Sequence, residues 1–217
     1  MSIKILLIES YGYKTALTGM RNPYQNRFKS DTIYDENDKP INIGENDLKL
    51  AQKLIINGPD HSKFMRQIHI GIDVVAPLYW WKEFDTYKVA TVANSESTMH
   101  TLANNPITLD NFSFDGVLNL HDNDWVNDLI TIIHLCETYR KKYIDTKNIA
   151  YWRRLIQILP EGWNQKRTVT INYATLRNIY FARKNHKLIE WQEFCNFIES
   201  IPFGKEFICY VKEKNNG

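Results

Sequence analysis

The stretch Lys88-Val89-Ala90-Thr91-Val92-Ala93-Asn94-Ser95-Glu96-Ser97 places a cation and a short apolar run before four consecutive polar side chains. Amide, hydroxyl and carboxylate groups packed into consecutive positions favour a site for a polar, anionic small molecule. A simpler interpretation is a strand that leads into a helix, with Asn94 or Ser95 as the N-cap and Glu96 in the first turn. The two interpretations are compatible, because the N-terminus of a helix is itself a site for anions.

Length and composition indicate one folded domain. The chain has 217 residues, of which 43% are hydrophobic, so it can bury a substantial core, and we expect a single domain over residues 1–217. The 27 basic and 25 acidic residues nearly balance, and we therefore expect no nucleic acid partner. The apolar run at residues 3–8 is too short for a membrane span and is followed by Glu9. We expect a soluble, cytoplasmic protein that does not bind membranes.

The reactive side chains follow none of the common catalytic spacings. Cys136, Cys195 and Cys209 form no CxxC pair, which favours buried thiols in a reducing compartment. The histidines are scattered, so we expect no metal site, and no glycine-rich phosphate loop is present.

Hydrophobic periodicity predicts a mixture of helices and strands. We expect strands over residues 3–8 and 64–72. We expect helices over residues 14–21, 47–57, 77–87, 125–143 and 148–159, and a last long helical region over residues 170–200. Residues 22–46 and 103–124 are rich in polar residues and are expected to be loops, and a loop as long as 22–46 is usually functional or mobile.

Arg183 continues the apolar face of a predicted helix. That face also carries Leu176, Ile179 and Tyr180. The guanidinium should therefore point inward or into a cleft, where it needs a carboxylate or an anionic ligand. The remaining basic positions are expected on the solvated side of the helix. They are Arg177, Lys184 and Lys187. An alternative function, an unrelated module that binds nucleic acid, would use these positions together with Tyr180.

Residues 86–97 resemble the signature of flavin-dependent thymidylate synthases, in which Arg-His-Arg is followed after seven residues by Ser. Thr86-Tyr87-Lys88 stand at the Arg-His-Arg positions, and one extra residue, Ala93, precedes the Asn. The resemblance continues along the chain with Leu159-Pro160, Thr170-Ile171-Asn172, Arg183 and Glu190-Trp191. It covers about residues 1–205.

This resemblance implies an α/β (α+β) fold with a mostly antiparallel sheet flanked by helices, assembled as a homotetramer. It implies FAD as cofactor, NADPH as reductant, and methylenetetrahydrofolate as carbon donor to dUMP, with no protein nucleophile. By position, Arg183 would be the catalytic residue that binds the pyrimidine and favours its ionised form. The other substrate-binding positions would be Glu83, Ser95, Glu96 and Ser97. The flavin-binding positions would be Thr86, Tyr87, Lys88, Asn172 and Asn178.

The chain departs from the family at several cationic positions. Thr86-Tyr87-Lys88 keeps one of two cations and loses the imidazole, and Met99 and Ile156 replace arginines. Lysine does not reproduce the bidentate geometry of a guanidinium. The alternative function is therefore a non-catalytic or redirected nucleotide-binding protein on the same fold.

Overall fold

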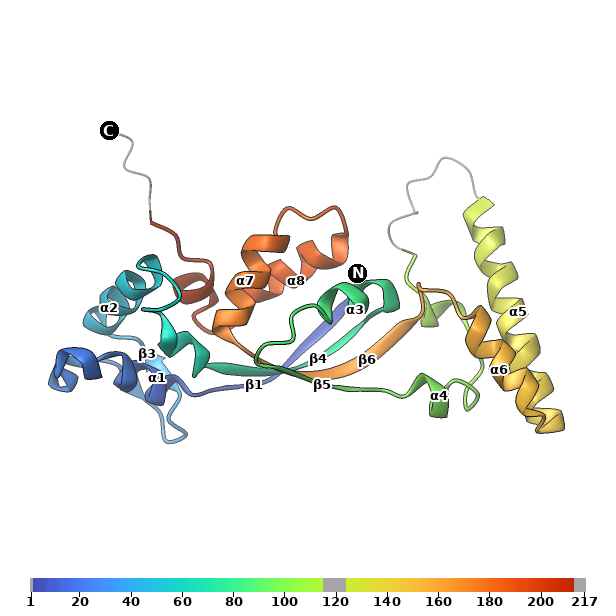
Figure 1. The fold of residues 1–217 in the computed structure, drawn as a ribbon, viewed down its shortest axis with the longest axis horizontal. Helices are drawn as coiled ribbons and strands as arrows, with labels where there is room; N and C mark the ends of the chain where they lie inside the picture. Colours follow the sequence, from blue (N-terminus) through green and yellow to red (C-terminus); the bar gives the residue numbers. More distant parts are fainter. Residues whose placement is uncertain (1, 115–123, 213–217) are drawn as a thin grey trace. The chain divides into compact units, whose positions relative to one another are not determined.

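The computed structural model describes residues 2–114 and 124–212 (Figure 1). The strands are β1 (Lys4–Tyr11), β2 (Ile33–Tyr34), β3 (Pro40–Asn42), β4 (His69–Pro77), β5 (Thr91–Ser95) and β6 (Asn164–Asn172). The α-helices are α1 (Tyr13–Met20), α2 (Glu45–Ile56), α3 (Leu78–Phe84), α4 (Thr98–Thr101), α5 (Asp124–Thr146), α6 (Ile149–Ile158), α7 (Tyr173–Arg183) and α8 (Ile189–Ser200). Short 3-10 turns and a π-helix at Gly204–Ile208 complete the described elements.

Four strands form one sheet in the order β1-β4-β6-β5, and β2 and β3 form a separate antiparallel hairpin. The central strands β4 and β6 run in opposite directions. At one end the backbone N–H of Tyr173 donates to the carbonyl of Ile68, and at the other that of Leu78 donates to the carbonyl of Trp163. The sheet is antiparallel and flanked by helices, which confirms the expected fold class.

The chain forms two compact units. Unit 1 comprises residues 1–4, 74–86 and 94–167, and unit 2 comprises residues 5–73, 87–93 and 168–217. Strands β1, β4, β5 and β6 contribute residues to both units. The expectation of a single domain stays a prediction. Among the described residues, no helix combines the length and hydropathy needed to cross a bilayer.

In unit 2, α7 and α8 lie on one face of the sheet strands (Figure 1). Alternate residues of β4, Ile70 and Ile72, are fully buried. The helices contribute large buried side chains to this core, which are Leu176, Ile179, Trp191, Phe194 and Ile198. The apolar residues of α8 recur at helical spacing, so they lie on one face of the helix, and that face packs into this core.

In unit 1, α5 and α6, both predicted as helices, pack side by side. Their cluster holds Leu102, Ile107, Phe112, Cys136 and Leu155. Helix α3 buries the rings of Trp80, Trp81 and Phe84, and the Trp80 and Phe84 rings stack with centroids 5.1 Å apart.

The predicted helical region over residues 170–200 is wrong at its start and in its middle. Residues 170–172 end strand β6, in which Val169 and Ile171 are buried and alternate with more exposed threonines. Asn172 then caps α7, and the chain leaves the helix between Arg183 and Ile189. An alternating segment directly before a helix was thus merged with that helix.

Two other expectations need correction. The strand predicted over residues 64–72 begins only at His69, after a 3-10 turn at Lys63–Arg66, and continues to Pro77. The predicted loop over residues 22–46 contains the β2–β3 hairpin and the start of α2. Of the predicted loop over residues 103–124, positions 115–123 lie outside the described residues, and the rest includes a 3-10 turn at Leu109–Asn111.

Candidate functional site

Arg183, the last residue of α7, lies half-buried between two aromatic side chains of unit 2. Its Nε donates a hydrogen bond of 2.9 Å to the phenolic oxygen of Tyr87. The guanidinium carbon is 4.8 Å from the ring centroid of Trp191 and 5.7 Å from that of Tyr87. Aromatic faces attract cations, and the attraction grows as water is excluded. The hydrogen bond and the two rings therefore hold this cation in one orientation.

Tyr87 reaches Arg183 from the connection that leads into β5. Further along this connection the carbonyl of Val89 accepts a hydrogen bond of 3.0 Å from Oγ1 of Thr175, in the first turn of α7. Ala90 follows with a φ of 55°, in the left-handed region that non-glycine residues rarely occupy. The connection is thus fixed to both ends of α7.

The other two positions of the Thr86-Tyr87-Lys88 run differ in their surroundings. Lys88, in unit 2, is exposed and makes no ion pair with another described residue. Thr86, in unit 1, donates from Oγ1 to the carbonyl of Glu83 at 2.8 Å. Glu83 is half-buried in α3. The one cation of the run therefore faces solvent.

The two predicted flavin-binding asparagines are in different surroundings within unit 2. Asn172 is 3% exposed and caps α7, because its Oδ1 accepts from the backbone N–H of Thr175 at 2.9 Å. Its Nδ2 lies 3.4 Å from the carbonyl of Arg66. Asn178 is exposed on α7. Their roles toward flavin stay predictions.

The predicted substrate-binding run lies where β5 gives way to α4 in unit 1. Ser95 ends the strand, and Glu96 follows it, its backbone N–H donating to the carbonyl of Lys166 at 2.8 Å. Ser97 is the N-cap of α4, since its Oγ accepts from the backbone N–H of His100 at 3.3 Å. The expected cap at Asn94 or Ser95 is therefore wrong, because the strand continues two positions further than predicted.

A cation of unit 1 that the sequence did not single out lies beside this run. The guanidinium of Arg167 is 4.3 Å from the ring centroid of Trp81, and it pairs with Asp85 at 2.7 Å. Its Nε donates to Gln165, whose own Nε2 donates to the carbonyl of Glu96 at 2.9 Å. Arg167 lies in the part of β6 between the predicted helices over residues 148–159 and 170–200, for which no element was predicted from the sequence.

A cavity of about 450 Å³ lies in unit 2. It is lined by Gly19, Met20, Asn22, Pro23, Tyr24, Leu54, Asp60, His61, Lys63, Phe64 and Gln67. Its volume falls in the range of small-molecule sites, and its walls combine two aromatic rings with a lysine and a histidine. No motif singled out these residues, although a loop as long as residues 22–46 was expected to be functional or mobile.

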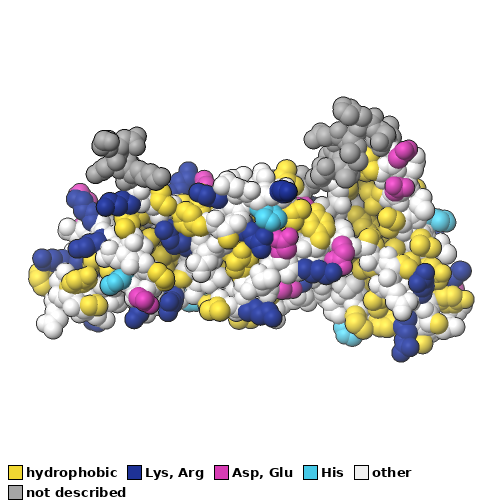
Figure 2. Space-filling model, turned by 45° about the horizontal axis from the view of Figure 1, so that its top comes forward, with side chains coloured by type: hydrophobic (Ala, Val, Ile, Leu, Met, Phe, Trp, Pro, Cys, Tyr) yellow, Lys and Arg dark blue, Asp and Glu magenta, His cyan; other side chains and the backbone are white. Residues whose placement is uncertain are grey.

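The basic residues of α7 are not all on the solvated side. Nη1 of Arg177 donates to the carbonyls of Ile208 at 2.5 Å and Tyr210 at 2.8 Å, and burial lowers the pKa of this arginine. The expectation of a solvated Arg177 is therefore wrong. On the face drawn in Figure 2, basic side chains are scattered with acidic and apolar ones among them.

Burial raises the pKa values of the three thiols. The pKa of Cys195 rises to about 12 and that of Cys209 to about 11, and Cys136 shifts in the same direction. All three are free cysteines. Because the thiolate is the nucleophilic form, the raised pKa values disfavour these thiols as nucleophiles at neutral pH.

Comparison with known proteins identifies the fold but no close relative. No protein-family model matches the sequence, and no curated protein sequence does. A crystal structure of thymidylate synthase X from Helicobacter pylori with FAD and dUMP superimposes with a TM-score of 0.71 at 16% identity, over 95% of this chain and 96% of that one.

A second structure of the flavin-dependent thymidylate synthase from Helicobacter pylori, also complexed with FAD and dUMP, gives a TM-score of 0.67 at 16% identity. It matches over 94% of this chain and 97% of its own. These matches extend over nearly the whole of each chain. The chain therefore has the fold of the flavin-dependent thymidylate synthases.

Proposed function

We propose that the chain is a diverged flavin-dependent thymidylate synthase, which binds FAD and methylates dUMP with methylenetetrahydrofolate as carbon donor and NADPH as reductant. The observation that carries the proposal is the end-to-end fold similarity, over 95% of this chain and 96% of the similar chain. Arg183, the residue that the resemblance assigns to the pyrimidine, is a half-buried cation of fixed orientation.

Arg183 is suited to stabilise an anionic pyrimidine. A cation whose position is fixed before the reaction stabilises developing negative charge without reorganising at that moment. Tyr87 holds Nε, and Trp191 covers one face of the guanidinium, so neither side chain has to move when the substrate arrives. Partial burial strengthens the interaction, because fewer water molecules screen the charge.

The residues around the 450 Å³ cavity fit part of a flavin. Tyr24, which is 50% exposed, offers an aromatic surface for a planar ring, and Lys63 and His61 offer donors to phosphate oxygens. When bound, FAD supplies the redox chemistry that reduces the transferred carbon to a methyl group. The chain's own residues then bind and orient the cofactor and the nucleotide.

The remaining predicted positions complete the proposal. In it, Glu83, Ser95, Glu96 and Ser97 contact the nucleotide, and Thr86, Lys88, Asn172 and Asn178 contact the flavin. The proposal also includes assembly as a homotetramer in the cytoplasm. Exposed apolar residues of the sheet support association with further copies, since Leu6 is 63% and Val92 65% exposed.

The alternative is a non-catalytic or redirected nucleotide-binding protein. It is favoured by the bond between Tyr87 and Arg183, because this phenol occupies the position at which the family carries an imidazole. In this alternative Arg183 still binds an anionic nucleotide, but flavin chemistry is lost.

The test is an absorbance spectrum of the purified protein in the near-ultraviolet and blue, before and after addition of FAD, followed by titration with dUMP. Flavin bands that shift with dUMP support the proposed enzyme, and turnover with NADPH and methylenetetrahydrofolate is then assayed. Absence of flavin binding together with saturable nucleotide binding supports the alternative. Absence of both overturns the two functions.

A further inference from the structure

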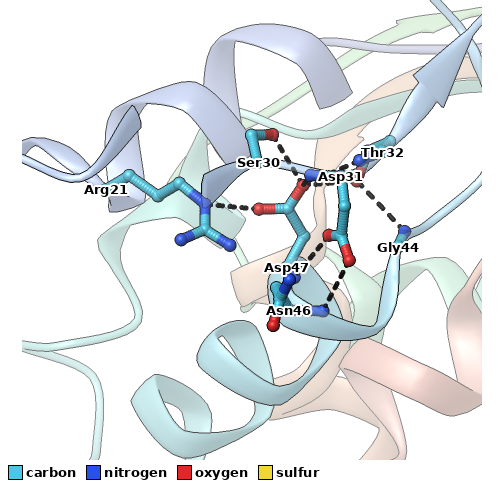
Figure 3. A network of polar contacts seen from close by, with 7 residues as sticks. All are labelled: Arg21, Ser30, Asp31, Thr32, Gly44, Asn46 and Asp47. Carbon is cyan, nitrogen blue, oxygen red and sulfur yellow. Dashed lines mark hydrogen bonds and ion pairs between the residues drawn. The ribbon is translucent and has the colours of Figure 1, made fainter. Parts of the chain in front are cut away.

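The carboxylate of Asp47 is fully buried near the start of α2. It contacts two separate segments of unit 2, namely Arg21 and residues 30–32 (Figure 3). Its Oδ1 accepts from Nε of Arg21 at 2.5 Å. Its Oδ2 accepts from Oγ of Ser30 at 2.7 Å and from Oγ1 of Thr32 at 2.6 Å. The backbone N–H groups of Asp31 and Thr32 point to the same oxygen, at 3.3 and 3.2 Å.

A second carboxylate, that of Asp31, binds in the reverse direction, from residues 30–32 to the start of α2. Asp31 accepts from the backbone N–H groups of Asn46 at 2.9 Å and Asp47 at 3.1 Å, which are at the N-terminus of α2. Gly44 lies so close that a Cβ there would be 2.1 Å from Cγ of Asp31. Residues 30–32 and the start of α2 are therefore fixed to each other by reciprocal hydrogen bonds (Figure 3).

Asp47 thus holds both ends of residues 22–29, which we name the 22–29 loop. Arg21 precedes the loop and Ser30 follows it. Within the loop no side chain is buried, and Phe28 is 82% exposed. Because the loop has no buried apolar contacts of its own, its conformation depends on hydrogen bonds within it and at its ends.

The same loop forms walls of two cavities. Asn22, Pro23 and Tyr24 line the 450 Å³ cavity. Asn22 and Phe28, with two further loop residues, line a second cavity of about 300 Å³. A carboxylate that closes the loop therefore also fixes one wall of the cavity assigned to flavin.

We propose that Asp47 is a positioning residue for the ligand of the 450 Å³ cavity, acting through the 22–29 loop. The ionised carboxylate accepts charge-assisted hydrogen bonds, which are stronger than neutral ones. Without it the loop loses its attachment at Arg21 and at residues 30–32, and Asn22 and Tyr24 lose their fixed places in the cavity wall. The proposal rests on the proposed function, since it takes this ligand to be FAD.

The test compares the full-length wild type with Asp47→Asn and with the double variant Ser30→Ala/Thr32→Val. The double variant keeps the buried Arg21–Asp47 ion pair, so it decides the question if Asp47→Asn does not fold. Ile198→Val, a buried change in α8 of the same unit, is the control for general loss of stability. Two quantities are measured for each protein, namely hydrogen exchange of residues 22–29 without ligand and the Kd of FAD by flavin fluorescence.

We expect the double variant to exchange residues 22–29 faster and to bind FAD about tenfold more weakly, the size of losing two hydrogen bonds. Ile198→Val should leave the exchange of the loop and the Kd of FAD within about twofold of the wild type, because Ile198 lines neither cavity and its side chain makes no hydrogen bond to Asp47. Unchanged exchange in the loop, or faster exchange with an unchanged Kd of FAD, overturns the proposal. A wild type that binds no FAD instead overturns the proposed cofactor, and the exchange data then decide alone whether Asp47 holds the loop.

Discussion

Nε of Arg183 donates a 2.9 Å hydrogen bond to the phenolic oxygen of Tyr87, a residue 96 positions earlier in the chain. The pair joins the end of α7 to the connection that enters β5. At the Tyr87 position the flavin-dependent thymidylate synthases that the chain resembles carry a histidine. The phenol therefore gives this chain its own means of orienting the cation.

Tyr87→Phe removes the acceptor and keeps the ring over the guanidinium. We expect the Kd of dUMP to rise about three- to tenfold, as for loss of one hydrogen bond. Titration calorimetry measures the Kd, and Tyr180→Phe, which removes a phenol bound to Glu199 on the neighbouring helix, is the matched control. An equal loss of affinity in both variants would show that Tyr87 has no specific role.

Arg183→Ala removes the cation itself. We expect the Kd of dUMP to rise about 10- to 100-fold, the range for losing a hydrogen bond to a charged group. The residue is only half-buried, so the protein should remain folded by circular dichroism. Lys187→Ala removes an exposed cation four positions later and should leave the Kd unchanged. A folded Arg183→Ala protein with wild-type affinity would exclude Arg183 from the site.

Ala90→Gly should stabilise the protein, because the φ of Ala90 is 55°. The left-handed conformation costs a non-glycine residue about 1–2 kcal/mol. Glycine removes this strain, but the greater conformational entropy of glycine in the unfolded state offsets part of the gain. We therefore expect the free energy of unfolding to rise by about 0.5–1 kcal/mol. Urea denaturation measures it. Ala93→Gly, inside β5, should change stability in the opposite direction, and the same sign in both variants would contradict the strain at Ala90.

Asp47 makes stability depend on acid pH. Burial alone would raise the pKa of this carboxyl, but hydrogen bonds from Thr32, Ser30 and Arg21 outweigh burial and lower it below the ordinary 3.8. A lowered folded-state pKa stabilises the protein above the unfolded value, and this stabilisation is lost as the pH falls through the folded value.

Denaturation from pH 7 downward should therefore show a loss of stability below about pH 4 that comes from Asp47. In Asp47→Asn this part of the pH dependence should be absent, although the variant is less stable at neutral pH because Arg21 keeps a buried, unpaired charge. Parallel pH profiles of the wild type and the variant would contradict the lowered pKa.

Local patterns predicted those parts of the fold whose packing follows one helical face. The stripes of α5, α6 and α8 were visible because apolar positions recur at helical spacing. Strand β6 was missed because Val169 and Ile171 alternate for only a few residues before the cap at Asn172. The stronger helical pattern of α7, which begins at Tyr173, led to residues 170–172 being predicted as helix.

The candidate site could be predicted only in part, because its contacts join residues far apart in the sequence. The inward position of Arg183 followed from its place on an apolar face, but the phenol that holds it lies on another element. Arg177 was expected to face solvent, but it is partly buried. Its acceptors are backbone carbonyls about 30 positions later, which no side-chain pattern reveals.

Both ends of the 22–29 loop are attached to one carboxylate, so the residues that hold the loop in place are different from those that it exposes to solvent. Its exposed side chains, among them Tyr24 and Phe28, can be exchanged without repacking a core, because none of them is part of one. Libraries that vary these positions while keeping Arg21, Ser30 and Asp47 would thus change what the cavity selects and leave the folding of the domain intact. The loop is a natural starting point for engineering new ligand preferences into this protein.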